Sequence, residues 1–150
     1  MKKIFIYYSF TGNGDVIASY LKKNDYEIKK VITKEPLPKN KALSILTGGF
    51  KALIGYKDKI ETLGIELDNY DQILIGSPIW NSRLSSPINS VLKVLKNNNR
   101  SVNFILYSAS GKATSAINKI KKEYKNSKVI LLKEPKKNIE LVKKELKIMI

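Results

Sequence analysis

The stretch that decides the fold of this chain is Ile4-Phe5-Ile6-Tyr7-Tyr8-Ser9-Phe10-Thr11-Gly12-Asn13-Gly14. Its first part, Ile4 to Tyr8, is an unbroken run of β-branched and aromatic residues, which is typical of a strand buried on both faces of a parallel sheet. Small and hydroxylic residues follow at once. We expect Asn13 to cap a helix that carries one apolar stripe, because apolar residues recur there at helical spacing. The stretch therefore predicts a buried strand, a tight turn and a helix.

The rest of the chain repeats this alternation. Apolar runs predict further strands at residues 72–76, 102–107 and 128–132, and alternation of apolar and polar residues predicts an outer strand at residues 26–33. Apolar stripes predict helices after Ser86, which we expect to be an N-cap before Pro87, after Gly111 and after Pro135. Residues 41–56 are expected to form two short helical pieces with a flexible joint at Gly48-Gly49, and Pro78 is expected to end the third strand. Five strands alternating with helices predict an α/β fold, a parallel sheet covered on both faces, in a single domain spanning residues 1–150.

Composition limits the chemistry that is possible here. The 150 residues include no Cys and no His, which excludes disulfides, thiolate metal sites and imidazole bases. Any reaction must use carboxylates, hydroxyls, Lys, Tyr or a bound cofactor. The apolar run at Ile4 is shorter than the roughly 7–15 residues of a signal-peptide core, and no apolar stretch reaches the ~18 residues of a membrane span. We therefore expect a cytoplasmic protein without a membrane partner.

The net charge of +15 favours an acidic partner. Almost all of the positive charge is Lys, and only Arg83 and Arg100 are Arg. Because Arg is the preferred residue for bidentate contacts to phosphates and bases, its scarcity argues against nucleic acid. A general enrichment in Lys, Ile and Asn is the other explanation of the charge, and it needs no specific partner.

Three loops follow buried strands, at residues 9–14, 77–86 and 108–112. In open parallel sheets, ligands bind outside the carboxyl ends of the strands, at the point where the strand order reverses. All three loops are rich in small and hydroxylic residues. That composition suits a planar ligand carrying a phosphate.

The first loop carries the sharpest signal. Ser9, Thr11 and Asn13 offer hydrogen-bonding side chains, and Gly12 and Gly14 let the backbone approach an oxyanion closely. The helix that follows directs its free N–H groups at the same place, so a phosphate could be bound there without any Arg or Lys. The alternative is an ordinary turn with a helix cap. The spacing is neither that of a Walker loop nor that of a Rossmann turn, and a receiver domain would need acidic residues here.

The second loop contains the only Trp of the chain, within Gly76-Ser77-Pro78-Ile79-Trp80-Asn81. A Trp beyond the end of a buried strand is well placed to lie against a flat ring. The alternative is that Trp80 packs on a neighbouring helix. The third loop, Ser108-Ala109-Ser110-Gly111, is a weak signal by itself, because short loops of this composition are common.

These residues resemble the flavodoxin family, whose phosphate loop is of the type T/S-x-T-G-N-T. Tyr7-Tyr8-Ser9-Phe10-Thr11-Gly12-Asn13 and Gly76-Ser77-Pro78-Ile79-Trp80 look especially like short bacterial and archaeal flavodoxins, as does Gly48-Gly49-Phe50-Lys51-Ala52-Leu53-Ile54-Gly55. The resemblance implies a flavodoxin-like three-layer αβα sandwich with a five-stranded parallel sheet in the order 2-1-3-4-5. It also implies one non-covalent FMN. Gly14 departs from the pattern, because the family usually has Thr or Ser there.

The resemblance also implies roles for the three loops. The side chains of Ser9, Thr11 and Asn13 and the amides of Phe10, Gly12 and Gly14 would hold the phosphate. Pro78, Ile79, Trp80 and Asn81 would lie along the flavin ring, with Trp80 stacked on it. Ser108, Ala109, Ser110 and Gly111 would line its far edge. No metal site and no catalytic side chain are expected.

Three functions fit these features. The leading hypothesis is an electron carrier that exchanges electrons with redox partner proteins, whose surfaces we expect to be acidic. The second is an FMN-dependent quinone reductase or nitroreductase, with residues 43–56 over a substrate pocket. The third is a basic domain that binds no flavin.

Overall fold

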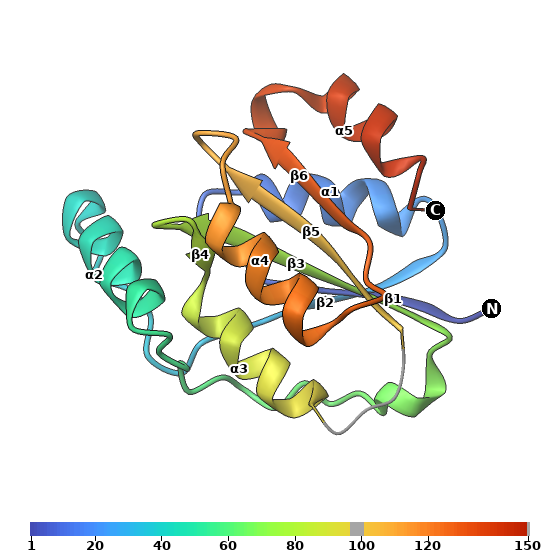
Figure 1. Ribbon diagram of the computed structural model, residues 1–150, viewed down its shortest axis with the longest axis horizontal. Coiled ribbons are helices and arrows are strands. Elements are labelled where there is room, and N and C mark those ends of the chain that lie inside the picture. The colour runs from blue at the N-terminus through green and yellow to red at the C-terminus, as the bar shows by residue number, and fades with distance from the viewer. Residues whose placement is uncertain (97–100, 150) are drawn as a thin grey trace.

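The computed structural model describes residues 1–96 and 101–149, and a six-stranded sheet forms its centre (Figure 1). The strands are β1 (Lys3–Tyr7), β2 (Tyr26–Lys30), β3 (Gln72–Trp80), β4 (Arg83–Leu84), β5 (Val102–Ser108) and β6 (Val129–Lys133). The α-helices are α1 (Asn13–Lys22), α2 (Lys41–Leu53), α3 (Ser86–Leu95), α4 (Thr114–Glu123) and α5 (Ile139–Leu146). Short 3₁₀ turns, η1 (Leu67–Asn69) and η2 (Pro135–Lys137), precede β3 and α5.

The predicted strand order is confirmed. Five parallel strands lie in the order β2-β1-β3-β5-β6, which is 2-1-3-4-5 when these strands alone are counted. The additional strand β4 is a two-residue antiparallel partner of the end of β3. The expected outer strand is shorter than predicted: β2 ends at Lys30, and Thr33 instead forms an isolated bridge with Ile60.

The buried strands alternate between two apolar cores, one on each side of the sheet. In β1, Ile4 and Ile6 face the core under α3 and α4, whereas Phe5 and Tyr7 face the core under α1 and α5. β3 and β5 alternate in the same way. The continuous apolar runs are needed because both faces of these strands are covered, with α1 and α5 on one side of the sheet and α3 and α4 on the other (Figure 1).

The caps of two helices differ from the prediction. The N-cap of α3 is Ser85, and Ser86 is the first helical residue, with Pro87 after it in the first turn. The N-cap of α1 is Gly12 rather than Asn13, and the Ser9 hydroxyl accepts the Gly14 N–H in the first turn of the helix. Gly12 takes φ 91° and ψ −4°, a left-handed conformation that favours glycine.

α2 is one continuous helix, so the expected joint at Gly48-Gly49 is wrong. The helix lies at the rim of the molecule beside β4 (Figure 1), and its buried residues are all small: Ser44, Gly48, Gly49 and Ala52. Its large apolar side chains point to solvent instead, with Leu46 70% and Phe50 61% exposed. α2 stays helical through Gly48 and Gly49 because the absence of side chains allows close packing there, and this packing outweighs the low helix propensity of glycine.

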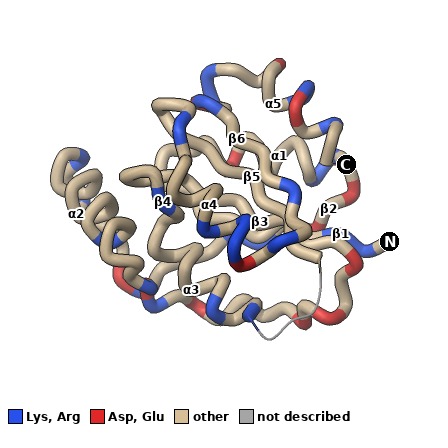
Figure 2. The backbone as a smooth tube through the Cα atoms, in the orientation of Figure 1, with Lys and Arg blue, Asp and Glu red and all other residues tan. Residues whose placement is uncertain are grey.

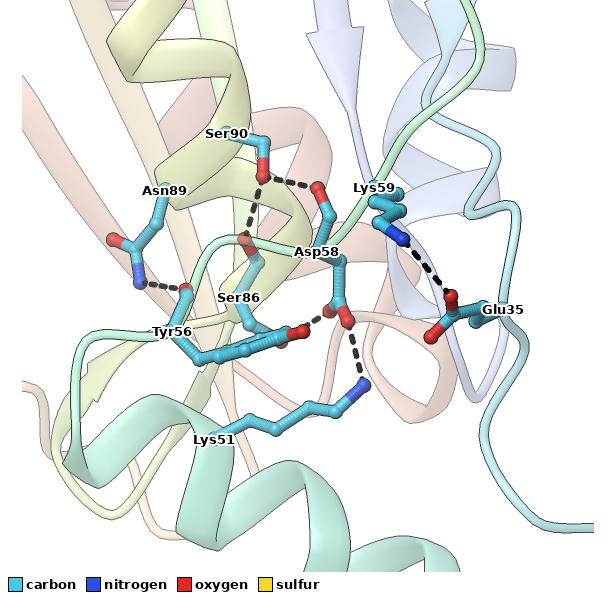
Figure 3. Close-up of polar contacts among 8 residues, drawn as sticks. All are labelled: Glu35, Lys51, Tyr56, Asp58, Lys59, Ser86, Asn89 and Ser90. Atoms are coloured by element: carbon cyan, nitrogen blue, oxygen red, sulfur yellow. Dashed lines mark hydrogen bonds and ion pairs between the residues drawn. The ribbon is translucent and has the colours of Figure 1, made fainter.

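A buried polar cluster fixes the segment that follows α2 (Figure 3). The Asp58 carboxylate accepts hydrogen bonds from Lys51 Nζ at 2.6 Å and from the Ser86 hydroxyl. The Ser90 hydroxyl donates to the Asp58 carbonyl, and Asn89 Nδ2 donates to the Tyr56 carbonyl. These bonds tie α2 to α3, because Lys51 belongs to α2 while the serines and the asparagine belong to α3.

We expect Asp58→Ala to lower the free energy of unfolding by about 3 kcal/mol, because it leaves a largely buried Lys51 ammonium and Ser86 hydroxyl without their acceptor. The nearby Glu35–Lys59 pair (Figure 3) provides a matched control. Its side chains are 67% and 75% exposed, so Glu35→Ala should cost less than about 0.5 kcal/mol. Urea unfolding of the two variants measures the difference, and equal costs would show that the Asp58 cluster does not stabilise the protein.

Candidate functional site

The three loops lie at the carboxyl ends of neighbouring strands β1, β3 and β5, and the first residues of the second loop, Ser77 to Trp80, form the end of β3. The first two loops are in contact, because the rings of Phe10 and Trp80 meet edge to face with centroids 6.2 Å apart. The first loop also meets β5, since the Tyr107 hydroxyl donates to the Tyr8 carbonyl. The strand order reverses between β1 and β3, which is where open α/β sheets bind ligands.

The turn at residues 9–14 presents unpaired amides. The first helical bond of α1 runs from the Val16 N–H to the Gly12 carbonyl at 3.2 Å. Within the described residues, the backbone N–H groups of residues 10–13 donate no hydrogen bond to a protein acceptor. Free donors at the N-terminal end of a helix dipole attract an anion.

The polar side chains of this turn mainly hold its shape. Ser9 Oγ accepts the Gly14 N–H at 3.2 Å, and Asn13 Nδ2 donates to Thr11 Oγ1 at 3.2 Å. Asn13 Oδ1 accepts the backbone N–H of Lys136, at 2.9 Å. The structure thus shows Ser9 and Asn13 organising the turn, and direct contact of their side chains with a phosphate stays a prediction.

Gly14 is required by the packing beneath the turn. A Cβ at this position would lie 2.6 Å from Tyr107 Oη and 2.8 Å from Tyr7 Cδ2, closer than real atoms approach. Burial raises the pKa of Tyr107 well above its ordinary value, so its hydroxyl stays protonated and donates to the Tyr8 carbonyl. The final Thr or Ser of the flavodoxin pattern therefore has no room here.

We expect Gly14→Ala to destabilise the protein by about 2 kcal/mol through overpacking. In a Tyr107→Phe background the cost should fall, because one of the two clashing atoms is gone while Tyr7 Cδ2 remains. Urea unfolding of the four proteins of this cycle gives the coupling energy. A cost of Gly14→Ala that is the same in both backgrounds would contradict this explanation.

Asp15 adds a negative charge next to the turn, but a lysine neutralises it. Burial acts to raise the pKa of Asp15, and hydrogen bonds from Lys30, Tyr7 and Ser9 outweigh it, so this pKa lies below its ordinary value. Lys30 Nζ lies 2.7 Å from Asp15 Oδ1. The carboxylate is ionised at neutral pH, and the ion pair reduces its repulsion of an anion at the turn.

β3 does not end at Pro78 but continues to Trp80, so this expectation is wrong. The Gly76 carbonyl points toward the β1 side of β3, where it accepts the Tyr8 N–H. The backbone groups of Pro78 point to the same side, because residues two apart in a strand have the same orientation. β1 pairs with β3 only as far as Gly76, so the missing N–H of Pro78 leaves no strand partner unsatisfied. The chain then turns at Asn81 and Ser82, whose φ values are 48° and 61°. Two positive φ values are typical of a type I′ hairpin turn, which pairs Trp80 with Arg83.

Trp80 packs against α2, which is the alternative that the sequence left open. A Cβ on Gly48 would lie 2.7 Å from Trp80 Cζ3, so this glycine makes room for the indole. Asn81 Nδ2 donates to the Gly49 carbonyl at 3.0 Å. A cavity of about 220 Å³ lies beside Trp80 and is lined by Phe10, Ser44, Ile45, Gly49, Ile79, Trp80 and Asn81. Stacking of Trp80 on a ligand ring stays a prediction.

The third loop is a compact turn next to β6. Gly111, with φ 71°, donates its N–H to Ser108 Oγ at 2.9 Å, and Ser110 Oγ accepts the Lys112 N–H. Ala109 and Ser110 are exposed. The Ser108 carbonyl accepts the Glu134 N–H from the segment after β6. Contact of this loop with a ligand stays a prediction.

The structure brings two lysines to this edge that the sequence did not single out. Lys136 lies over Gly12, and the side chain of Lys133 lies over Gly111. Binding of a phosphate by this turn without a cationic residue stays a prediction. Nothing in the sequence distinguishes these two from the other lysines, because the segment after β6 reaches the first turn only through the tertiary fold. Figure 2 shows Lys and Arg spread over most elements rather than gathered at one place.

A Lactobacillus acidophilus flavoprotein crystallised in complex with FMN is 22% identical and aligns over 93% of this chain and 97% of its own, with a TM-score of 0.70. The chain has the flavodoxin-like fold. A putative flavoprotein from Bacteroides uniformis has the same TM-score at 18% identity, covering 97% of each chain. One from Bacteroides eggerthii, at 15% identity, has a TM-score of 0.66 over 98% of this chain and 96% of its own.

No protein-family model and no curated protein matches the chain. In the parts of the flavodoxin-like chain that the structure describes, no helix is long and apolar enough to cross a membrane. The same parts contain no cluster of three acidic side chains that could hold a metal ion.

Proposed function

We propose that this protein binds one FMN at the carboxyl edge of its sheet and carries electrons. The observation that supports this most directly is the set of unpaired amides at residues 10–13, at the strand-order reversal of a flavodoxin-like fold. A flavoprotein with the same fold was crystallised with FMN. Bound FMN would supply the one- or two-electron chemistry, and the protein would set its position and potential.

Each loop receives a role in this proposal. The turn at residues 9–14 binds the phosphate through its backbone amides, with Thr11 exposed at the turn. Phe10 belongs to this turn and also lines the cavity beside Trp80, so a ligand held by its phosphate can extend toward Ile79, Trp80 and Asn81. The loop at residues 108–111 follows β5, which is the next strand along this edge, and we assign it to the far edge of the ring.

The partner surface in this proposal is the outer face of α2. Its large apolar side chains Leu43, Ile45, Leu46, Phe50 and Leu53 are more than half exposed. Ile45 also lines the cavity beside Trp80, so a protein docked on α2 would lie next to the proposed flavin. Large exposed apolar patches mark interaction sites, and the net charge of +15 favours a redox partner with acidic groups around its apolar contact.

We expect the protein to quench the fluorescence of FMN with a stoichiometry of one. Riboflavin, which lacks the phosphate, should bind at least about tenfold more weakly, because charge-assisted hydrogen bonds contribute about 1.5–3 kcal/mol each. A fluorescence titration of each ligand with purified protein measures both constants. The absence of quenching at saturating FMN would refute the proposal, and equal affinities for the two flavins would refute the phosphate role of the turn.

A second candidate is a flavin-dependent quinone reductase, and the cavity between α2 and Trp80 favours it. Our proposal predicts that the FMN-loaded protein is reduced by dithionite and reoxidised by ferricyanide. It should oxidise NADH or NADPH in the presence of menadione no faster than free FMN does, because a carrier has no nicotinamide site of its own. Steady turnover that depends on the protein would support the reductase instead.

A further inference from the structure

The side chain of Lys136 lies directly on the turn at residues 9–14. Both its Cδ and its Nζ are 3.6 Å from the place where a Cβ on Gly12 would be. Gly12 is the residue with φ 91° at the start of α1, so the ammonium group lies beside the unpaired amides of that turn. Lys136 reaches this point from η2, more than 120 residues further along the chain.

The turn itself holds Lys136 in place. Asn13 Oδ1 accepts the Lys136 backbone N–H at 2.9 Å, which fixes the start of the lysine side chain relative to α1. Pro135 is buried, and the Lys137 N–H closes the 3₁₀ turn on the Glu134 carbonyl at 2.8 Å. These contacts fix the backbone of Lys136 beside α1, and its exposed side chain extends from there over Gly12.

The charges around η2 leave Lys136 available for an anion. Lys137 forms an ion pair with Glu134 at 2.6 Å, which neutralises both groups. Among residues 1–96 and 101–149, no carboxylate lies within ion-pair distance of Lys136. Asp15, the acidic residue in the first turn of α1, is paired with Lys30.

We propose that Lys136 Nζ is a direct ligand of the phosphate bound at the turn, and that it makes the site selective for a phosphorylated flavin. This rests on the proposed FMN binding. Gly14 cannot supply the hydroxyl that the flavodoxin pattern has at the end of the loop, because Tyr107 and Tyr7 occupy that space. The lysine adds a charge-assisted bond on the Gly12 side of the same turn, and a phosphate dianion gains more from it than a neutral flavin does.

The test compares Lys136→Met with Lys121→Met. Methionine keeps the apolar stem and the backbone N–H that Asn13 accepts, and the control removes the same charge from an exposed lysine of α4, on the other side of the sheet. Lys136→Met should weaken FMN binding about tenfold at low salt, the effect of one charge-assisted hydrogen bond. Its riboflavin affinity should change less than twofold, and Lys121→Met should change neither affinity more than twofold. Lys136→Arg should recover part of the loss.

The outcomes separate the two proposals. Wild-type protein that binds no FMN overturns the proposed function. FMN affinities that are equal in Lys136→Met and Lys121→Met overturn the role of Lys136 and leave FMN binding intact. An equal loss for FMN and riboflavin in Lys136→Met also overturns it, because a phosphate ligand cannot act on a flavin that has no phosphate. Thermal unfolding of each apoprotein verifies that the variants are folded.

Discussion

The close packing at Gly14 is the constraint on which the rest of this site depends. Because Gly14 has no side chain, the Tyr107 hydroxyl reaches the Tyr8 carbonyl beneath the first turn of α1. The helix therefore begins close against β1 and β5, and its unpaired amides emerge at the edge of the sheet. A residue with a side chain at this position would push the helix start away from both strands.

The electrostatics of the edge follow from which charges are already paired. Asp15 and Lys30 neutralise each other, as do Glu134 and Lys137. The positive end of α1 and the ammonium group of Lys136 lie next to Gly12, and among the described residues Lys136 has no ion-pair partner. The net charge of +15 does not attract an anion equally at every point of the surface, because exposed charges more than about 10 Å away are largely screened.

α2 has the reverse of the usual amphipathic arrangement. Its small residues pack on Trp80 and the hairpin turn, whereas its large apolar residues face solvent. Periodicity alone could not predict this, because apolar spacing identifies a helical face but does not say which face is buried. The interruption expected at Gly48-Gly49 was wrong for the same reason: the indole of Trp80 and the side chain of Asn81 fill the space that those glycines leave.

The strand order was implied by the resemblance to flavodoxins, and the residues by themselves determined the alternation of strands and helices, the two-sided burial of the central strands and the composition of the three loops that follow them. These features are local, since an apolar run or a glycine-rich turn acts through its own residues and its immediate neighbours in the chain. Only the tertiary structure decided that Gly14 must be a glycine, that Trp80 packs on α2, and that Lys136 lies over Gly12. Each of these depends on a contact between segments far apart in the sequence, and nothing in the composition of either segment indicates which distant partner the fold will bring to it.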